Sequence, residues 1–164
     1  MEHVRYMERI RDYYIAQGYE KSYEWAHFDE IPFTPLDKPL SECRVTLLST
    51  SDVSVVRDDD APLSAEETTV GAVYSLPWST SPEKLYSRQE SYDRYATSLD
   101  DINAYLPITR LETLAREGVI GGVTERFHNV NRGYSKRLMM ETAAPAALER
   151  CREDNADVAL LVPV

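Results

Sequence analysis

The 164-residue sequence is poor in the residues that usually hold metals or form disulfides, with two cysteines and three histidines. Cys43 and Cys151 lie far apart in the sequence and lack the spacing of metal ligands. Both are therefore predicted to be buried, unreactive thiols, with a redox pair as the open alternative. No metal site is expected.

Long apolar runs and an excess of positive charge are also absent. No stretch approaches the roughly 18 apolar residues of a membrane-spanning helix, and the charged N-terminus has no signal-peptide core. The 18 Lys and Arg residues stand against 28 Asp and Glu, which gives a net charge of -10. Such a charge disfavours nucleic acid and anionic membranes as partners. We expect a cytoplasmic protein.

Glycine is scarce, at six residues, and neither a Gly-rich dinucleotide fingerprint nor a phosphate-binding loop is present. The Gly-x-Ser-x-Gly element of serine hydrolases is missing as well. These absences disfavour a nucleotide-binding domain and leave no evident cofactor.

What is present predicts one α/β domain over residues 1–164, in which residues 1–40 form a helix and an extended arm. Apolar residues recur at helical spacing in 2–17, and Gly18 follows as a natural stop. Residues 19–40 are rich in aromatics and prolines, which exclude a continuous helix or a central strand. This arm packs either on the domain or on a partner subunit.

The core, residues 41–164, alternates strands and helices around a long irregular excursion at about 52–106. Strands are predicted at 44–50, 70–76, 119–124 and 157–164, and helices at 109–118 and 136–152. Thr109 and Glu112 form an apparent capping box, and Pro145 either kinks the second helix or starts a new one. Val158–Val162 is apolar throughout, which predicts a parallel strand buried on both faces. The order indicates a Rossmann-like, mostly parallel, three-layer open sheet.

A ligand site is predicted where three segments converge at the carboxyl edge of this sheet. They are Ser49-Thr50, the stretch 125–129 with His128, and Pro163-Val164. Ser49 and Thr50 either bind ligand or are ordinary turn residues. His128 is either structural or a catalytic base, and the second role requires a partner that orients the ring.

Three segments carry a resemblance to a known family: TPLDKPLSECRVTLLST (34–50), SYDRYATSLDDINAYLPITRLETLAREGVIGG (91–122) and DNADVALLVPV (154–164). They resemble the selenoprotein B family, which comprises glycine, sarcosine, betaine and D-proline reductase components and shorter standalone relatives. The resemblance implies a reductase whose thiol or selenol helps to cleave a carbon–nitrogen bond of a small amine or amino acid. The expected partners are that substrate, a thioredoxin-type thiol reductant and further copies of the chain.

The resemblance also implies where the reactive group lies. Family members follow the last strand with a cysteine or selenocysteine, so we expect the redox residue after Val164. Since selenocysteine is encoded by a codon normally read as stop, the hypothesis is that such a codon follows Val164. A thiolate or selenolate at that place, beside a helix N-terminus, would be in its reactive form.

Further residues of these segments are candidates to bind substrate. Asp93 and Asp101 would hold a cationic amine, and Asn103 would shape the site. Arg110 would hold a carboxylate, or is a surface charge at a helix end. The alternative function is a non-catalytic subunit or scaffold that acts through protein–protein contacts.

Overall fold

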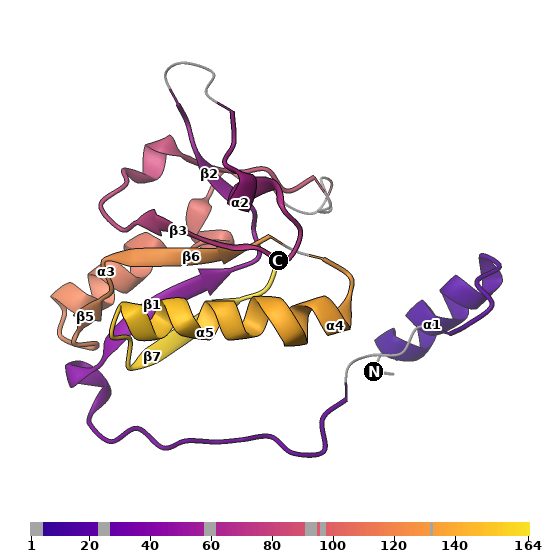
Figure 1. Cartoon of the computed structure of the whole chain (residues 1–164), viewed down its shortest axis with the longest axis horizontal. Coiled ribbons are helices and arrows are strands. Elements are labelled where there is room, and N and C mark those ends of the chain that lie inside the picture. The colour runs from indigo at the N-terminus through magenta and orange to yellow at the C-terminus, as the bar shows by residue number, and fades with distance from the viewer. Residues whose placement is uncertain (1–4, 23–26, 58–61, 91–94, 96–97, 132) are drawn as a thin grey trace. The chain divides into compact units, whose positions relative to one another are not determined.

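We describe a computed structural model of the chain, drawn in Figure 1. The structure describes residues 5–22, 27–57, 62–90, 95, 98–131 and 133–164. It divides into two units, Met1–Thr34 and Pro35–Val164. Within the described ranges, no helix combines the length and the apolar composition needed to cross a membrane.

The first unit contains helix α1, Tyr6–Ala16, as the apolar spacing predicts. Gly18 ends it in the left-handed region, with φ of 88°, where a side chain would be strained. The ring of Tyr14 meets that of Tyr19 edge to face, with centroids 5.4 Å apart. Residues 27–34 form neither helix nor strand, and their side chains are exposed.

The second unit is built on a five-stranded sheet centred on β1, Arg44–Ser49. β7, Val158–Val162, pairs with β1 in parallel. The other side of β1 pairs in parallel with β5, Gly122–Val123, and then with β6, Arg126–Val130. β3, Val73–Pro77, pairs with β6 in the opposite direction. The sheet is therefore mostly parallel and the fold mixed α/β, as expected.

The position of His128 differs from the prediction. The strand expected at 119–124 is short, because pairing with β1 is interrupted at Thr124 and Glu125 and resumes with Leu48 opposite His128. Residues 126–130 are therefore a second strand segment along β1, and His128 lies inside the sheet and not at its carboxyl edge.

Close packing of backbone explains a glycine just before β5. A Cβ atom at Gly121 would lie 2.5 Å from the carbonyl carbon of Glu42, which no real side chain tolerates. Gly121 N also donates to the carbonyl of Cys43, at 2.9 Å. The close backbone approach expected of the Gly121-Gly122 pair is thus found at its first residue.

One face of the sheet packs on α3, Ile108–Arg116. Leu47 and Phe127 project from adjacent strands toward Leu111, and all three belong to the main hydrophobic cluster. Phe127 is fully buried and meets Trp78 edge to face, with ring centroids 6.0 Å apart. Alternation along the strands sends the neighbouring residues to the opposite face.

A second cluster lies under the helical segment that ends in α5. It joins Val73 and Val130 of the sheet to Ala143 and Ala147, with Leu48 packed against it. The segment runs through α4, Lys136–Leu138, a π-helical stretch at Met139–Ala143, and α5, Ala144–Glu153. Pro145 follows the π-helical stretch at the start of α5, and the residues before it are already helical. In Figure 1, α5 passes in front of the strands and α3 lies behind them.

The predicted capping box at Thr109 is wrong. α3 begins at Ile108 after Pro107, and no side chain caps it. Thr109 Oγ1 instead donates to Asn103 Oδ1 at 2.8 Å, and Glu112 accepts from the indole of Trp78 at 3.1 Å. Both side chains are thus used to fix other segments against α3.

A capping box does occur at the start of α2, Ala65–Thr68. Ser64 Oγ accepts from Glu67 N at 3.2 Å, and Ser64 N donates to the Glu67 carboxylate at 2.9 Å. The described residues of 52–106 therefore contain more regular structure than the expected irregular excursion. It also holds β3 and a two-stranded sheet of β2, Val53–Val55, and β4, Leu85–Ser87, because Val53 and Leu85 are buried in the main cluster.

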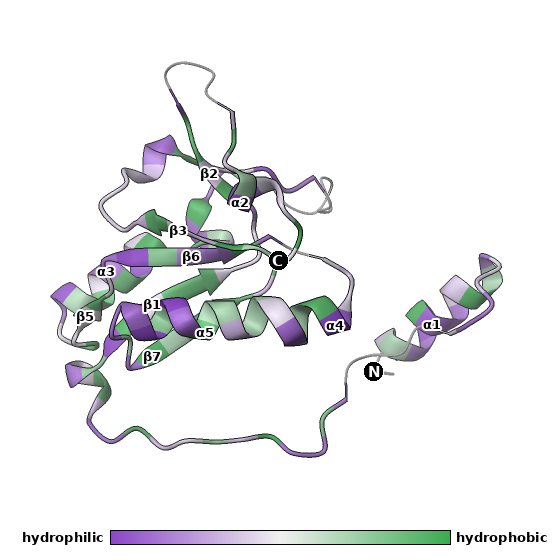
Figure 2. Cartoon of the chain, in the orientation of Figure 1, coloured by the Kyte–Doolittle hydropathy of each residue, from purple (hydrophilic) through white to green (hydrophobic). Residues whose placement is uncertain are grey.

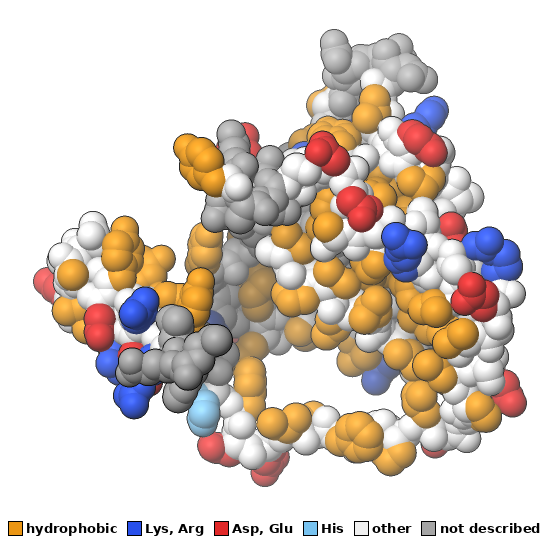
Figure 3. Space-filling view, turned by 180° about the vertical axis from the view of Figure 1, so that it is seen from behind, with side chains coloured by type: hydrophobic (Ala, Val, Ile, Leu, Met, Phe, Trp, Pro, Cys, Tyr) orange, Lys and Arg blue, Asp and Glu red, His pale blue; other side chains and the backbone are white. Residues whose placement is uncertain are grey.

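The burial predicted for the last strand is wrong, although its parallel pairing is confirmed. β7 pairs with β1 alone among the described strands, and Leu160 and Leu161 are 38% and 63% exposed. Figure 2 colours β7 in the green of apolar residues, whereas β6 carries purple stretches. Figure 3, seen from behind, likewise shows many hydrophobic side chains among scattered charges. Val158 and Val162 are partly buried against the main cluster, so apolarity here marks an edge strand that is covered only in part.

Candidate functional site

The carboxyl edge of the sheet brings together two of the three predicted segments. Thr50 N donates to the carbonyl of Val162 at 3.2 Å, one step beyond the paired residues of β1 and β7. The Thr50 hydroxyl accepts from Val164 N at 2.8 Å and lies 3.2 Å from the Val164 carbonyl. Thr50 therefore fixes the chain at Val164 beside the end of β1.

Ser49 is buried and shapes the turn that follows β1. Its hydroxyl donates to the carbonyl of Tyr105 at 2.9 Å, accepts from Ser51 N at 3.2 Å, and lies 2.7 Å from the Ser51 hydroxyl. Asp52 continues this turn with φ of 51°, a left-handed conformation that aspartate tolerates better than most residues. The hydroxyl bonds of Ser49 are those of a turn-forming residue.

Two further residues are linked to this turn, Asn129 through its side-chain oxygen and Gln89 through its backbone N–H. Asn129, opposite Ser49 across the β1–β6 pair, accepts from Val53 N at 3.5 Å. Gln89 N donates to Ser87 Oγ at 3.0 Å, and Ser87 Oγ donates to the carbonyl of Ser51 at 2.6 Å. The strand that holds Asn129 also carries Arg126 and His128, so its sequence pattern did not mark Asn129, and the sequence around Gln89 offered no signal either.

These amides are buried and incompletely bonded. Gln89 is 4% exposed and Asn129 is 0% exposed. Within the described residues, Gln89 Nε2, Gln89 Oε1 and Asn129 Nδ2 have no hydrogen-bond partner. Arg88 Nε, in the residue before Gln89, is likewise buried without a partner, although buried polar atoms are almost always paired in folded proteins.

The other predicted substrate residues lie on the connection into α3. Asp101 Oδ1 accepts from Asn103 N at 2.9 Å and caps a short 3-10 turn, Ile102–Ala104. Asn103 in turn accepts from Thr109, and Arg110 is exposed on α3. Burial raises the pKa of Tyr105, and the negative charge of Asp101 adds to this. Asp93 lies outside the described residues.

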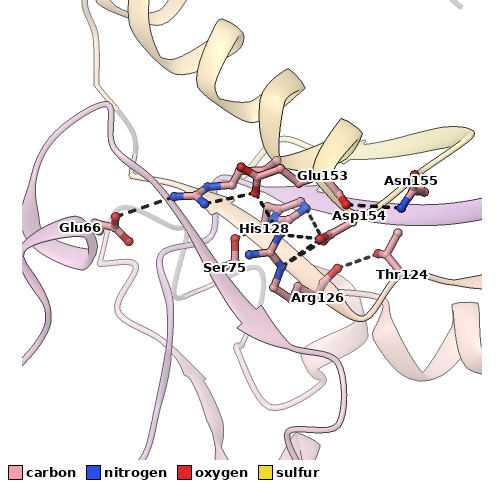
Figure 4. A network of polar contacts seen from close by, with 9 residues as sticks. Glu66, Ser75, Thr124, Arg126, His128, Glu153, Asp154 and Asn155 are labelled. Atoms are coloured by element: carbon pink, nitrogen blue, oxygen red, sulfur yellow. Dashed lines mark hydrogen bonds and ion pairs between the residues drawn. The ribbon is translucent and has the colours of Figure 1, made fainter.

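His128 belongs to a different network, between β6 and the end of α5 (Figure 4). Its ring is fully buried, with Nδ1 2.9 Å from Ser75 Oγ and Nε2 3.4 Å from Asp154 Oδ2. The second contact is too poorly aligned for a hydrogen bond. Burial lowers the pKa of His128, the carboxylate of Asp154 opposes this, and nearby Arg126 reinforces it. The ring is neutral at pH 7 and has no exposed surface, as the structural alternative requires.

Arg126 dominates that network. Its Nε lies 3.0 Å from Asp154 Oδ1 and 3.3 Å from Oδ2, and its Nη2 donates to Glu153 at 3.1 Å. Arg150 approaches Glu153 at 3.3 Å and Glu66 at 3.9 Å. Charge-assisted bonds of this kind are stronger than neutral ones. They tie β6 to the residue that ends α5.

The two cysteines are free thiols. Cys43 is buried and donates to the carbonyl of Pro39, with Sγ 3.3 Å from the oxygen. Burial raises the pKa of Cys151, and Asp154 raises it further. A raised thiol pKa disfavours the thiolate, which is the reactive form.

Comparison with known proteins gives one curated relative. The chain is 28% identical over 114 residues to the sarcosine reductase complex component B subunit beta of Peptoclostridium acidaminophilum. The match covers 68% of this chain but 26% of the relative, so the chain spans about a quarter of that protein. No family profile matches, and no solved structure is similar. The match supports a distant relationship to this reductase component.

Proposed function

We propose that the chain is a reductase-family protein that binds a small amine or amino acid at the carboxyl edge of its sheet. A thiol or selenol then cleaves a carbon–nitrogen bond of the bound molecule reductively. The observation that carries the proposal is the match to a sarcosine reductase component over 68% of the chain. The helices on both faces of a mostly parallel sheet fit a Rossmann-like, three-layer arrangement, in which ligands bind at this edge.

The redox group is proposed to lie outside these 164 residues, next to Val164. Support comes from Thr50, which holds Val164 beside the end of β1, and from the unreactive surroundings of Cys43 and Cys151. A selenocysteine or cysteine there would be reduced again by a thioredoxin-type thiol. The nucleotide sequence after the Val164 codon tests this point: UGA followed by a cysteine-containing frame is expected, and any other stop codon contradicts it.

The second candidate is a non-catalytic subunit of a homo- or hetero-oligomer. It is favoured by the apolar, exposed β7, whose Leu161 is 63% exposed, and by exposed Phe33 and Ile31 near the end of the first unit. A row of unpaired backbone groups on an apolar edge strand readily pairs with another chain. This candidate predicts a stable complex without ligand binding.

Ligand mapping on the intact chain separates the two candidates. Titration with sarcosine, glycine, betaine and D-proline, followed by NMR, should shift the backbone signals of Ser49, Thr50 and Asn103. Thr50→Val, which keeps the shape of the side chain and removes its hydroxyl, should weaken binding. Thr113→Val on α3, where the hydroxyl bonds within its own helix, is the matched control. No shift with any of the four compounds would refute the enzymatic proposal.

A further inference from the structure

Helix α1 of the first unit has no buried side chain. The helix contains 11 residues, and isolated helices shorter than about 12–15 residues are only marginally stable in water. In proteins, such helices are stabilised mainly because their apolar face packs on a neighbouring surface. We therefore expect another surface to cover α1.

The apolar side chains of α1 lie on one face of the helix. Tyr6, Ile10 and Tyr13 follow the i, i+4, i+7 spacing of an amphipathic helix, and Met7 lies beside them. Tyr6, Met7 and Tyr13 are each more than half exposed. This face contains a groove of about 430 Å³, called here the α1 groove, which is lined among the described residues by Tyr6, Arg9, Ile10, Tyr13 and Tyr14. Its volume is within the range of binding pockets in proteins.

Two aromatic contacts hold one wall of the α1 groove in place. The ring of Tyr14 meets that of Tyr13 edge to face, with centroids 5.8 Å apart, and meets that of Tyr19 at 5.4 Å. Tyr19 follows Gly18, the residue whose left-handed conformation ends the helix. A wall that is already ordered loses little side-chain entropy when it binds. The α1 groove is therefore suited to take up an apolar side chain.

Positive charges border the apolar face on both sides. Successive residues of an α-helix are about 100° apart, so Arg9 and Arg11 lie on opposite sides of Ile10. The acidic residues Glu8 and Asp12 lie about 160° from Ile10, on the back of the helix. Among the described residues, no hydrogen bond or ion pair engages the Arg9 side chain, and the pair of Arg11 with Asp12, at 3.3 Å, is exposed and thus weak. A surface that covers this face meets two cations and no carboxylate.

This charge pattern disfavours two of the possible occupants. A second copy of α1 would bring arginine against arginine at both borders, whether the two helices were parallel or antiparallel, and like charges that face each other weaken binding. An anionic membrane is opposed by the net charge of -10 of the chain. A concave groove also fits an inserted side chain better than a flat lipid surface.

We infer that α1 is a docking helix for an acidic segment of a partner protein. An apolar side chain of that segment enters the α1 groove, and carboxylates on both sides of it pair with Arg9 and Arg11. Charge complementarity of this kind gives specificity and speeds association. The inference concerns the first unit alone and does not depend on the proposed function.

The first test uses two helical peptides as probes. One has leucines at heptad positions a and d and glutamates at the bordering positions e and g, and the other has lysine in place of each glutamate. At low salt the parent chain should bind the glutamate peptide at least about tenfold more tightly in calorimetry. Arg9→Glu together with Arg11→Glu should reverse this preference, because glutamate keeps the helix and inverts the charge. Lys21→Glu, an exposed position outside the helix, should leave the preference unchanged.

The second test addresses the groove itself. Ile10→Ala removes a side chain that lines the groove and should raise the Kd of the glutamate peptide about tenfold. Ile15→Ala is the matched control, since Ile15 lies about 140° from Ile10 on the same helix. Alanine is the best helix former, so circular dichroism should show no loss of helix in either variant. Equal binding of the two peptides, no binding of either, or an equal effect of the two alanine variants would overturn the inference.

The other occupants predict different results. If a second copy fills the α1 groove, sedimentation velocity should show a dimer that Ile10→Ala abolishes and Ile15→Ala retains. If a membrane does, the backbone NMR signals of α1 should shift with phosphatidylcholine–phosphatidylserine vesicles and not with the glutamate peptide. Either result would overturn the inference. Neither bears on the proposed function, which concerns the second unit.

Discussion

β6 and β7 both pair with β1 in parallel, and their sequences would suggest the reverse of their positions. β6, with the sequence RFHNV, is buried at Phe127, His128, Asn129 and Val130. β7, with the sequence VALLV, has exposed side chains at Ala159, Leu160 and Leu161. The polar strand is inside because β3 pairs with its outer edge and helices cover both faces. In the described structure no strand pairs with the outer edge of β7, and only Val158 and Val162 pack against the main cluster.

The comparison teaches that position in the sheet, more than hydropathy, decides burial here. β6 can be buried because its polar atoms find partners: Ser75 for His128 and Asp154 for Arg126. β7 needs no such partners, since its side chains have no polar atoms. Its apolar surface is instead what an additional neighbour would cover.

The largest expected effect is on the β6 side of this comparison. Phe127→Ala removes a fully buried ring that packs against Trp78 and should lower the free energy of unfolding by about 3–5 kcal/mol. Leu161→Ala, on β7, should lower it by less than about 1 kcal/mol, because that side chain is 63% exposed. Urea denaturation measures both. Equal losses would show that the two strands are equally covered in solution.

The ion pair of β6 should give the next largest effect. Asp154→Asn removes the carboxylate that Arg126 binds through Nε at 3.0 Å, and the Asp154 side chain is 7% exposed. The free energy of unfolding should fall by about 1–3 kcal/mol, the range for hydrogen bonds to charged groups. Glu149→Gln, exposed on the same helix, is the control. An Asp154→Asn variant as stable as the parent would show that the network is dispensable.

Stability measured as a function of pH should separate the contribution of His128 from those of the acidic groups. Burial lowers the pKa of His128 below its ordinary 6.5, so the unfolded chain takes up a proton at this site before the folded chain does. Stability should therefore fall as the pH drops below about 6.5, by at most about 1.4 kcal/mol per unit for one proton. His128→Asn should flatten this decline. A decline of unchanged slope in the variant would assign it to other groups.

Glu67 should affect stability in a lower pH range than His128 does. Burial alone would raise the pKa of Glu67, but hydrogen bonds from Ser64, Arg57 and Ser54 together lower it below its ordinary 4.5. The stability that these bonds contribute is present above about pH 4.5 and is lost as the pH falls further. Glu67→Gln should therefore alter the acid limb of the curve while leaving the His128 window in place. A change in stability that is confined to pH values above about 4.5 would contradict this assignment.

The smallest effect is expected on the exposed face of β7. Leu161→Lys should change the free energy of unfolding by less than about 0.5 kcal/mol, as is usual for surface substitutions. Urea denaturation at several protein concentrations is the measurement. A larger loss that grows with concentration would mean that a partner covers Leu161, and would remove the contrast between the strands.

Much of this fold could be predicted from the sequence where the local pattern and the tertiary structure agree. α1, β1 and β3 lie close to their predicted positions, because apolar periodicity and turn residues mark their ends. The parallel pairing of β7 with β1 also follows from the order of strands and helices. Helix α3 was found but its start was misplaced, since Thr109 and Glu112 bond to Asn103 and Trp78 and not to the helix end.

The candidate site was less accessible to prediction. The meeting of Thr50 and Val164 follows from two parallel strands that end at one edge. His128 was misplaced because no local signal reveals that pairing with β1 stops after Val123 and resumes at His128. Gln89 was missed because the turn at Ser51, which Ser87 joins to Gln89, is distant in sequence and near only after folding.

The central position of β1 has a consequence for the time course of folding. Arg44, which begins the strand, donates its backbone N–H to Asp157 at 2.7 Å across a sequence separation of 113 residues. Its other neighbours, β5 and β6, are also distant in the sequence. Chains dominated by such long-range pairings fold slowly, in milliseconds to seconds, because loop entropy is lost before the contacts form. During synthesis, the second edge of β1 therefore stays unpaired until residues 158–162 have left the ribosome.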